Sequence, residues 1–341
     1  MLGIDEIKNM TKVELHRHLE GSIRPATLLE LARENGVELP AGSIAELMPY
    51  ISHTDNDISL LDYLLKFDVV LKPLKKPEDL ERVTWEVIED AVRDNIIYLE
   101  LRFSPEFIEN KTGIPAFYAA RVITRTSAKA SKIFALPLTI TLIATRELGL
   151  DSSICIIREA SSLSIDGVTG FDIAGDEVNF PVSMFEQAII DARRSGLGVT
   201  AHAGEVGSGR EVELALGYGV QRIGHGVNAV NDEGAMEAIR KHDALVEVCL
   251  TTNLHVGAIR SYAEHPARRF YDSGIKITFC ADDPQMSFIT LSDEIWFASK
   301  YLGFNRDEIL MTQLMGVDKA FIGDDIKRQL KMKLGKGFKY S

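Results

Sequence analysis

The sequence has few of the features that mark a membrane protein or a secreted protein. No uninterrupted apolar stretch approaches the roughly 20 residues that a membrane-spanning helix needs. The amino terminus, MLGIDEIKNMTK, has neither an apolar core of signal-peptide length nor a small-residue cleavage site. We therefore expect a cytoplasmic protein that does not bind membranes.

Cysteine is also scarce, and its placement argues against a scaffold held by disulfides. The three cysteines, Cys155, Cys249 and Cys280, are odd in number and far apart in the chain. Each lies in an apolar stretch, so we expect buried thiols in a reducing cytosol. None has the close-paired spacing of a thiolate metal site.

Positive charge is in the minority. The chain has 38 Lys and Arg against 50 Asp and Glu, a formal net charge of −12, which argues against a broad nucleic-acid-binding surface. Linkers, low-complexity tracts and sequence repeats are missing too, and no feature indicates an oligomeric state. With 45% apolar residues the chain can form a large core, and we expect a single domain over residues 1–341.

Short β-branched apolar runs alternate with stretches that have the spacing of amphipathic helices. Leu80, Val83, Val87 and Ala91, for example, recur at helical spacing before the second run. Several runs are almost continuously apolar, as parallel strands buried on both faces should be. The expected strands cover residues 13–18, 96–104, 137–146, 168–175, 196–204, 220–226, 244–250 and 275–283.

Eight alternations of strand and helix predict an α/β protein with a (β/α)₈ TIM barrel. A doubly wound open sheet is the alternative. That fold would place a glycine-rich phosphate-binding turn after an early strand, and the sequence has no turn of this form.

The chain between the first two expected strands, residues 19–95, is longer than a single barrel helix requires. It contains ISLLDYLLKF (58–67), which predicts an inserted helical lid over the barrel mouth, with Leu60, Tyr63, Leu64 and Phe67 as gate residues. The alternative is that these side chains only form the core of the insertion. The stretch from Asp307 onward predicts closing helices.

Polar side chains gather where the expected strands end. Active sites of (β/α)₈ barrels lie at the carboxyl ends of the strands, so residues from five separate strands should meet at one mouth. His16 and His18 lie two positions apart and therefore face the same side of a strand, where they are either metal ligands or polar strand-end residues. The residues concerned are His16, His18, Asp172, Gly175, His202, Gly204, Glu205, His225, Asp282 and Asp283.

Four of these residues form a set of donors suited to Zn²⁺. Three neutral imidazoles, from His16, His18 and His202, together with the carboxylate of Asp282 match the ligand preferences of zinc, and water would complete the shell. A centre with two metals is the competing hypothesis. In many barrel hydrolases a carboxylated lysine after the fourth strand bridges two metals, but that strand ends here in FDIAGDE, so one zinc per chain is favoured.

The remaining polar residues suit the work of a hydrolase. Zinc can lower the pKa of a bound water from 15.7 to about 7. His225 would take or orient the proton of that water, and Glu205 would act as general acid toward the substrate. Asp283 would orient the hydroxide or the substrate.

The ordered motifs VELHRHLEGS, LELRFSPE, GFDIAGDE, TAHAGE, RIGHG and CADDP resemble those of the adenosine deaminase family across nearly the whole chain. The resemblance implies a (β/α)₈ barrel with one zinc ion that hydrolyses the 6-amino group of a purine, releasing ammonia. It places the zinc on His16, His18, His202 and Asp282. It also implies that Glu205 protonates the purine N1 and that His225 assists the hydroxide. Asp283 would contact N7, and the N–H of Gly175 would meet N3.

The sequence departs from the family pattern at several positions, which leaves the choice of substrate open. Glu20 stands where the family usually has an aspartate that tends to meet the sugar 5′-hydroxyl. CLTTN (249–253) replaces a motif close to CPxSN, and Ala281 replaces a threonine. Adenosine is the expected substrate, with adenine, a 5′-modified adenosine or an N6-substituted nucleotide as alternatives. His53, His242, His255 and His265 are expected to have surface or packing roles.

Two other classes of protein compete with a 6-aminopurine deaminase. The first is a purine-binding relative without catalytic activity, which the presence of Glu205, His225 and all four ligands opposes. The second is a zinc hydrolase that acts on an amide or a phosphoester.

Overall fold

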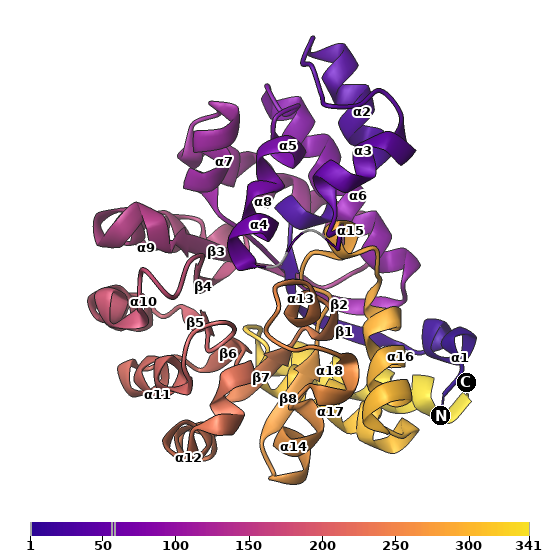
Figure 1. The fold of residues 1–341 in the computed structure, drawn as a ribbon, viewed down its shortest axis with the longest axis vertical. Helices are drawn as coiled ribbons and strands as arrows, with labels where there is room; N and C mark the ends of the chain where they lie inside the picture. The colour runs from indigo at the N-terminus through magenta and orange to yellow at the C-terminus, as the bar shows by residue number, and fades with distance from the viewer. Residues whose placement is uncertain (1, 56, 58, 341) are drawn as a thin grey trace.

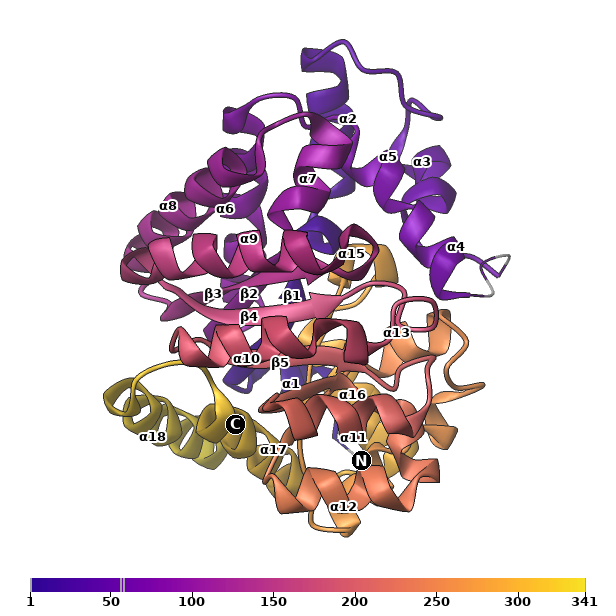
Figure 2. The same ribbon diagram turned by 90° about the vertical axis from the view of Figure 1, so that its left-hand side faces the viewer.

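The computed structural model describes residues 2–55, 57 and 59–340. Eight parallel strands form one sheet in chain order, β1 to β8, with helices around it (Figures 1 and 2), which confirms the predicted (β/α)₈ barrel. All eight strands lie inside or within one residue of the predicted runs, although several runs extended beyond the strand into the turn that follows. Their bounds are β1 (Lys12–His18), β2 (Ile96–Phe103), β3 (Leu138–Thr145), β4 (Val168–Ala174), β5 (Gly198–Ala203), β6 (Arg222–His225), β7 (Leu245–Val248) and β8 (Lys276–Phe279).

The barrel closes through a short seam between its last and first strands. Asp282, just after β8, forms an isolated parallel bridge with Arg17 of β1. The Asp282 N–H donates to the carbonyl of His16, and the His18 N–H donates to the carbonyl of Asp282, both at 2.9 Å. Buried Glu14 adds to the seam, because its carboxylate accepts the N–H of Ala281 at 3.0 Å. The seam therefore lies at the mouth, among the predicted ligands.

Helices connect successive strands on the outside of the barrel. One helix lies ahead of the barrel, one or two follow most strands, and the last strand is followed by four. Apart from the helices of the insertion, which are described below, they are α1 (Ile4–Asn9), α7 (Pro105–Thr112), α8 (Ala116–Phe134), α9 (Gly149–Ser162), α10 (Glu186–Arg194), α11 (Gly209–Tyr218), α12 (Glu233–Lys241), α13 (Leu250–His255), α14 (Ala267–Asp272), α15 (Pro284–Ser287), α16 (Leu291–Leu302), α17 (Arg306–Lys319) and α18 (Asp324–Tyr340). α17 packs against β8 and β1, in keeping with the predicted closing helices.

The insertion between β1 and β2 is helical, as expected. Its helices are α2 (Pro25–Glu34), α3 (Ile44–Ile51), α4 (Leu60–Leu65), α5 (Phe67–Leu71) and α6 (Pro77–Arg93). α2, α3 and α5 lie at the top of the molecule in both views (Figures 1 and 2). Ile58, the first residue of the stretch predicted as a lid, lies outside the described residues.

The barrel interior below the mouth contains a buried network of ion pairs. Arg102 of β2 pairs with Asp172 of β4 at 2.7 Å and with Glu247 of β7 at 2.8 Å. Arg222 of β6 pairs with the same Glu247 at 2.6 Å and with Glu100 of β2 at 2.7 Å. All five side chains are fully buried. Breaking a buried ion pair leaves an uncompensated charge, so this network holds together the strands β2, β4, β6 and β7 below the site.

One prediction about the cysteines is wrong. Cys249 and Cys280 are buried free thiols, but Cys155 is exposed on α9, where Ile156 and Ile157 supply the inward face. An apolar stretch of sequence did not distinguish the two faces of that helix. Among the described residues, no helix is both long enough and apolar enough to cross a membrane.

Candidate active site

Three imidazole nitrogens and one carboxylate oxygen converge at the barrel mouth. The Nε2 atoms of His16, His18 and His202 lie 3.1 to 3.3 Å from one another. Oδ1 of Asp282 lies 3.1 Å from His16 Nε2 and 3.3 Å from His18 Nε2. Ligands of a tetrahedral zinc at normal bond lengths stand about 3.3–3.4 Å apart, so these donors fit such an ion.

Two carboxylates behind the imidazoles fix the direction in which the ring nitrogens point. Glu247 lies 2.7 Å from Nδ1 of His16, and Asp172 lies 3.2 Å from Nδ1 of His202. Metal-binding histidines commonly donate their second ring N–H to such an acceptor. The Nε2 lone pairs of both rings then face the same point, and a cation at that point would relieve their mutual repulsion.

His225 lies beside this cluster. One ligand atom each from His16, His202, His225 and Asp282 lie within 4.8 Å of one another, so His225 is a second candidate ligand. Its Nε2 is 3.9 Å from Asp282 Oδ2, however, whereas His18 Nε2 is 3.3 Å from Oδ1. The shorter and more even separations favour His18 as the ligand and leave His225 adjacent to it.

The backbone is strained at two of these residues. Asp282 has φ 59° and His225 has φ 67°, in the left-handed region that residues other than glycine rarely adopt. Such strain persists where the surroundings hold the residue, and it clusters at active sites. Here it turns the chain at the ends of β8 and β6.

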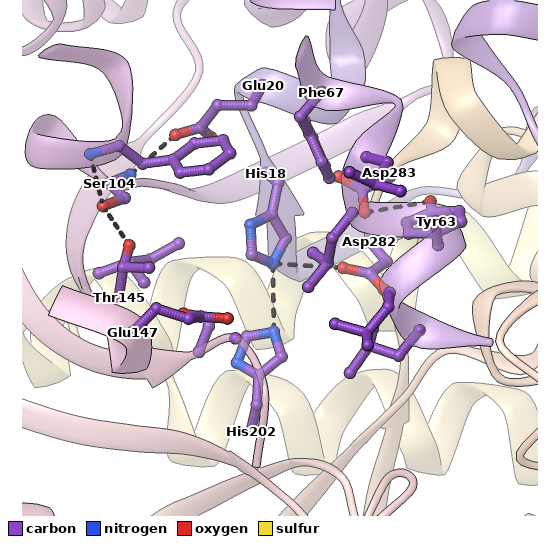
Figure 3. Close-up of a pocket in the computed structure, with 18 of the residues that line it drawn as sticks. His18, Glu20, Tyr63, Phe67, Ser104, Thr145, Glu147, His202, Asp282 and Asp283 are labelled. Carbon is purple, nitrogen blue, oxygen red and sulfur yellow. Dashed lines mark hydrogen bonds and ion pairs between the residues drawn. The ribbon is translucent and has the colours of Figure 1, made fainter. Parts of the chain in front are cut away.

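A cavity of about 550 Å³ opens above the four donors (Figure 3). Every residue predicted to act on substrate or metal lines it except His16, which lies beneath. The gate residues of α4 and the start of α5 contribute to its apolar wall; whether they move as a lid remains a prediction. The predicted residues in the lining are His18, Glu20, Leu60, Tyr63, Leu64, Phe67, Gly175, His202, Glu205, His225, Asp282 and Asp283.

Glu205 is a buried carboxyl group without a lysine or arginine partner among the described residues. It is 5% exposed, and its Oε1 accepts an N–H from Asn253 at 3.0 Å. Burial, followed by the negative charges of Asp282 and Glu177, raises its pKa well above the usual value for glutamate. A glutamate that keeps its proton near neutral pH can serve as a general acid.

Asp283 has a similar environment on the opposite wall. Its Oδ2 accepts the hydroxyl of Tyr63 at 3.1 Å, a contact visible in Figure 3, and its buried Oδ1 has no partner among the described residues. Burial and the adjacent charge of Asp282 raise its pKa. Gly21 lies against this carboxyl, because a Cβ there would come within 1.7 Å of Oδ1. A protonated Asp283 can donate to a ring nitrogen of a substrate.

Glu20 lies at the edge of the cavity and is bound on one side only. Its Oε1 accepts the N–H of Ser104 at 2.8 Å, while its buried Oε2 has no partner among the residues described. Burial raises its pKa to about 7. Glu20 lines the cavity, so this unpartnered oxygen is the candidate acceptor for a hydroxyl of a ligand.

Sequence patterns did not indicate several residues that support the site. Glu247 interrupts a strand that otherwise looks apolar, and this interruption was the available signal. Arg102 was expected to pair with Glu106 at the mouth, but it pairs with Asp172 and Glu247. Asn253 and His265 are both buried and lie behind Glu205 and His225. The expectation of a surface or packing role does hold for exposed His242 and for His53 and His255, whose rings stack at 3.9 Å.

Comparisons with known proteins agree with this geometry. The family described as adenosine deaminase matches residues 11–336. An adenosine deaminase of Shewanella denitrificans is 34% identical over 325 residues, covering 95% of this chain and 98% of that protein. An amidohydrolase of Burkholderia ambifaria solved with bound Zn has a TM-score of 0.90 at 26% identity, covering 98% and 92% of the two chains. The N6-mAMP deaminase of Arabidopsis has a TM-score of 0.87 at 29% identity, covering 97% and 99%.

Proposed function

The chain belongs to the adenosine deaminase family, and on that basis we propose that it converts adenosine to inosine and ammonia with one zinc ion per chain. Membership supports hydrolytic deamination of adenosine or a related 6-aminopurine. The observation that carries the zinc proposal is the convergence of the His16, His18, His202 and Asp282 donors at tetrahedral spacing, beside a Glu205 whose pKa is raised by burial.

Each residue has a task in the proposed reaction. When bound, a zinc ion acidifies water and so supplies a nucleophile at neutral pH. Glu205 gives its proton to N1 while the nucleophile adds at C6, so that negative charge does not build up on the ring. Asp283 donates to N7 and the Gly175 N–H donates to N3, which together orient the purine. The C6–N bond then breaks, ammonia leaves with one proton of the water, and the other water proton passes from the C6 oxygen to Glu205, which leaves the 6-oxo purine and the restored acid.

The charges of the cavity favour a neutral nucleoside over a nucleotide. Glu20 and Glu147 line it, and Lys111 is its only lysine or arginine in the described part of the chain. Lys111 already pairs with Asp68, so no lysine or arginine among the described lining residues is free for a phosphate. Like charges in a poorly hydrated cleft repel by several kcal/mol. The apolar gate residues would suit a neutral substituent at the 5′ position.

A nucleotide substrate is the second candidate, because the Arabidopsis relative is named as an N6-mAMP deaminase. The test is a panel of adenine, adenosine, neutral 5′-modified adenosines, AMP and N6-methyl-AMP, followed by ultraviolet absorbance and by ammonia release. We expect adenosine or a neutral 5′-modified adenosine to be turned over far faster than AMP. Preference for a monophosphate would refute the nucleoside assignment, and no turnover of any purine would refute the deaminase.

We also propose a cytoplasmic location. The support is chemical, since Cys155, Cys249 and Cys280 are all free thiols, as is usual in a reducing compartment.

A further inference from the structure

A chain of four hydrogen bonds runs from a backbone amide to two groups of the proposed reaction. The N–H of Ala267 lies 3.0 Å from Nδ1 of His265, and Nε2 of His265 lies 3.1 Å from Oδ1 of Asn253. Nδ2 of Asn253 lies 3.0 Å from both Oε1 of Glu205 and Nδ1 of His225. Asn253 belongs to α13 and His265 precedes α14, so two segments of the connection between β7 and β8 meet here.

The direction of every bond in this chain follows from its first member. A backbone N–H can only donate, so Nδ1 of His265 must accept and the ring is not doubly protonated. Burial supports this state, because it lowers the pKa of His265 to about 3. The proton of the neutral ring therefore sits on Nε2 and is donated to the Asn253 oxygen. That oxygen is thereby fixed, and the two amide hydrogens of Asn253 face Glu205 and His225.

The amide imposes one state on each of its two acceptors. Nδ1 of His225 lies 3.0 Å from the Asn253 amide nitrogen and 3.3 Å from Oε1 of Glu205. Because the amide can only donate at the shorter contact, Nδ1 accepts, and the neutral ring carries its proton on Nε2, the nitrogen that faces Asp282. Oε1 of Glu205 also accepts, so a proton on this carboxyl sits on Oε2. All four side chains are at most 5% exposed, and water does not compete with these bonds.

We propose that His265 and Asn253 are positioning residues that set the tautomer of His225 and select the oxygen of Glu205 that carries the acid proton. In this arrangement His225 donates from Nε2 and orients the nucleophile, and it does not act as the base. The inference rests on the proposed deaminase reaction, because it assigns tasks within that reaction.

The first test compares two substitutions of His265 in the full-length enzyme as purified with its metal. His265→Gln can still accept from Ala267 and donate to Asn253, whereas His265→Leu has similar size but neither bond. Losing a supporting partner of this kind commonly costs about 10- to 100-fold in activity. We expect His265→Leu to lower kcat by about that factor with KM within about threefold, and His265→Gln to restore most of it. His242→Leu, at an exposed helix end, is the matched control.

The second test reads the tautomer directly. In protein labelled with ¹⁵N at histidine, we expect the His225 ring, identified by its loss in His225→Gln, to be protonated at Nε2 and bare at Nδ1. Asn253→Asp replaces the donor by an acceptor, so the His225 proton should move to Nδ1 and kcat should fall by on the order of 10²-fold. Thermal unfolding and metal content are measured alongside each variant.

Three results would overturn the proposal: equal kcat in His265→Leu and the parent, equal losses in the Leu and Gln variants, or a parent His225 protonated at Nδ1. If Asn253→Asp does not fold, the two His265 variants and the spectrum of the parent still test the proposal. A parent enzyme that deaminates no purine would instead refute the proposed function, which is a separate outcome.

Discussion

The interior of the barrel and its mouth both bury carboxylates, but in opposite electrostatic settings. In the interior, Glu247 lies between Arg102 and Arg222, whose positive charges outweigh the cost of burial and hold its pKa well below the usual value. At the mouth, Glu205 and Asp283 have no lysine or arginine partner among the described residues, and burial raises their pKa values.

This difference shows how one type of side chain serves two purposes. The paired carboxylates stay ionised and hold the imidazoles and arginines in place. The unpaired carboxyls keep protons that a reaction can use. Groups whose environments push their pKa values apart commonly mark the acids and bases of an active site.

Loss of a proposed metal ligand at the mouth should have the largest effect. We expect His18→Ala to abolish turnover and to lower the metal content from about one zinc per chain, because three donors hold the ion less well than four. Elemental analysis and the purine assay check this, with His242→Ala as an exposed control. Two metals per chain, or full activity of His18→Ala, would contradict the assignment.

Removal of the proton at Glu205 should have the next largest effect. Glu205→Gln keeps the shape and can still accept from Asn253, but it has no acid proton. We expect kcat to fall by about 10²-fold or more, while folding and metal content are kept. Kinetics within about tenfold of the parent would show that Glu205 is not the acid.

The same substitution at Glu247, in the interior, should lower stability, whereas Glu205→Gln should not. Glu247→Gln leaves two buried arginines without their shared counter-charge, and breaking a buried pair in this way costs about 3–5 kcal/mol. Chemical unfolding of Glu247→Gln and Glu205→Gln in parallel measures the contrast. Equal stabilities would show that the interior network does not hold the fold.

A buried carboxyl outside the interior network and the mouth tests whether burial without a lysine or arginine partner raises the pKa of such a group. Glu294 of α16 accepts the N–H groups of Leu250 and Thr251 at 2.7 and 2.9 Å, and burial raises its pKa to about 8. The unfolded chain releases this proton at a lower pH, so the stability that Glu294 contributes is present at pH 4 and lost as pH rises through about 8. Glu294→Gln does not titrate. We therefore expect the free energy of unfolding of Glu294→Gln, relative to that of the parent, to rise as the pH increases from acidic to alkaline. Parallel pH profiles would contradict the shift.

The smallest effect is expected at Glu20, at the edge of the mouth. Its free Oε2 can accept a ribose hydroxyl, so Glu20→Ala should raise KM for adenosine more than for adenine, which lacks the sugar. A single lost hydrogen bond to a charged or polar partner is worth about 1–3 kcal/mol. Equal changes in KM for the two substrates would show that Glu20 only holds the turn through Ser104.

The barrel and most of the mouth could be predicted from the sequence because the strands neighbour one another in the order in which they occur in the chain. Short apolar runs locate the strands, and polar residues at or just after the end of a run face the mouth, as His202, Glu205 and Asp282 do. Glu247 was overlooked because a charge inside a buried strand is only tolerable with partners that are distant in sequence. His265 was assigned a packing or surface role because its contact with the site, through Asn253, depends on how the chain between α13 and α14 folds back.

The seam between β8 and β1 has a consequence for how the protein is made. The proposed ligands His16 and His18 precede Asp282 by more than 260 residues of chain. The complete ligand set exists only after the final strand has docked against the first, which closes the long loop between them. Metal loading would then follow synthesis of the barrel, and a bound ion would link the first strand, β1, to the segment after the last strand, β8.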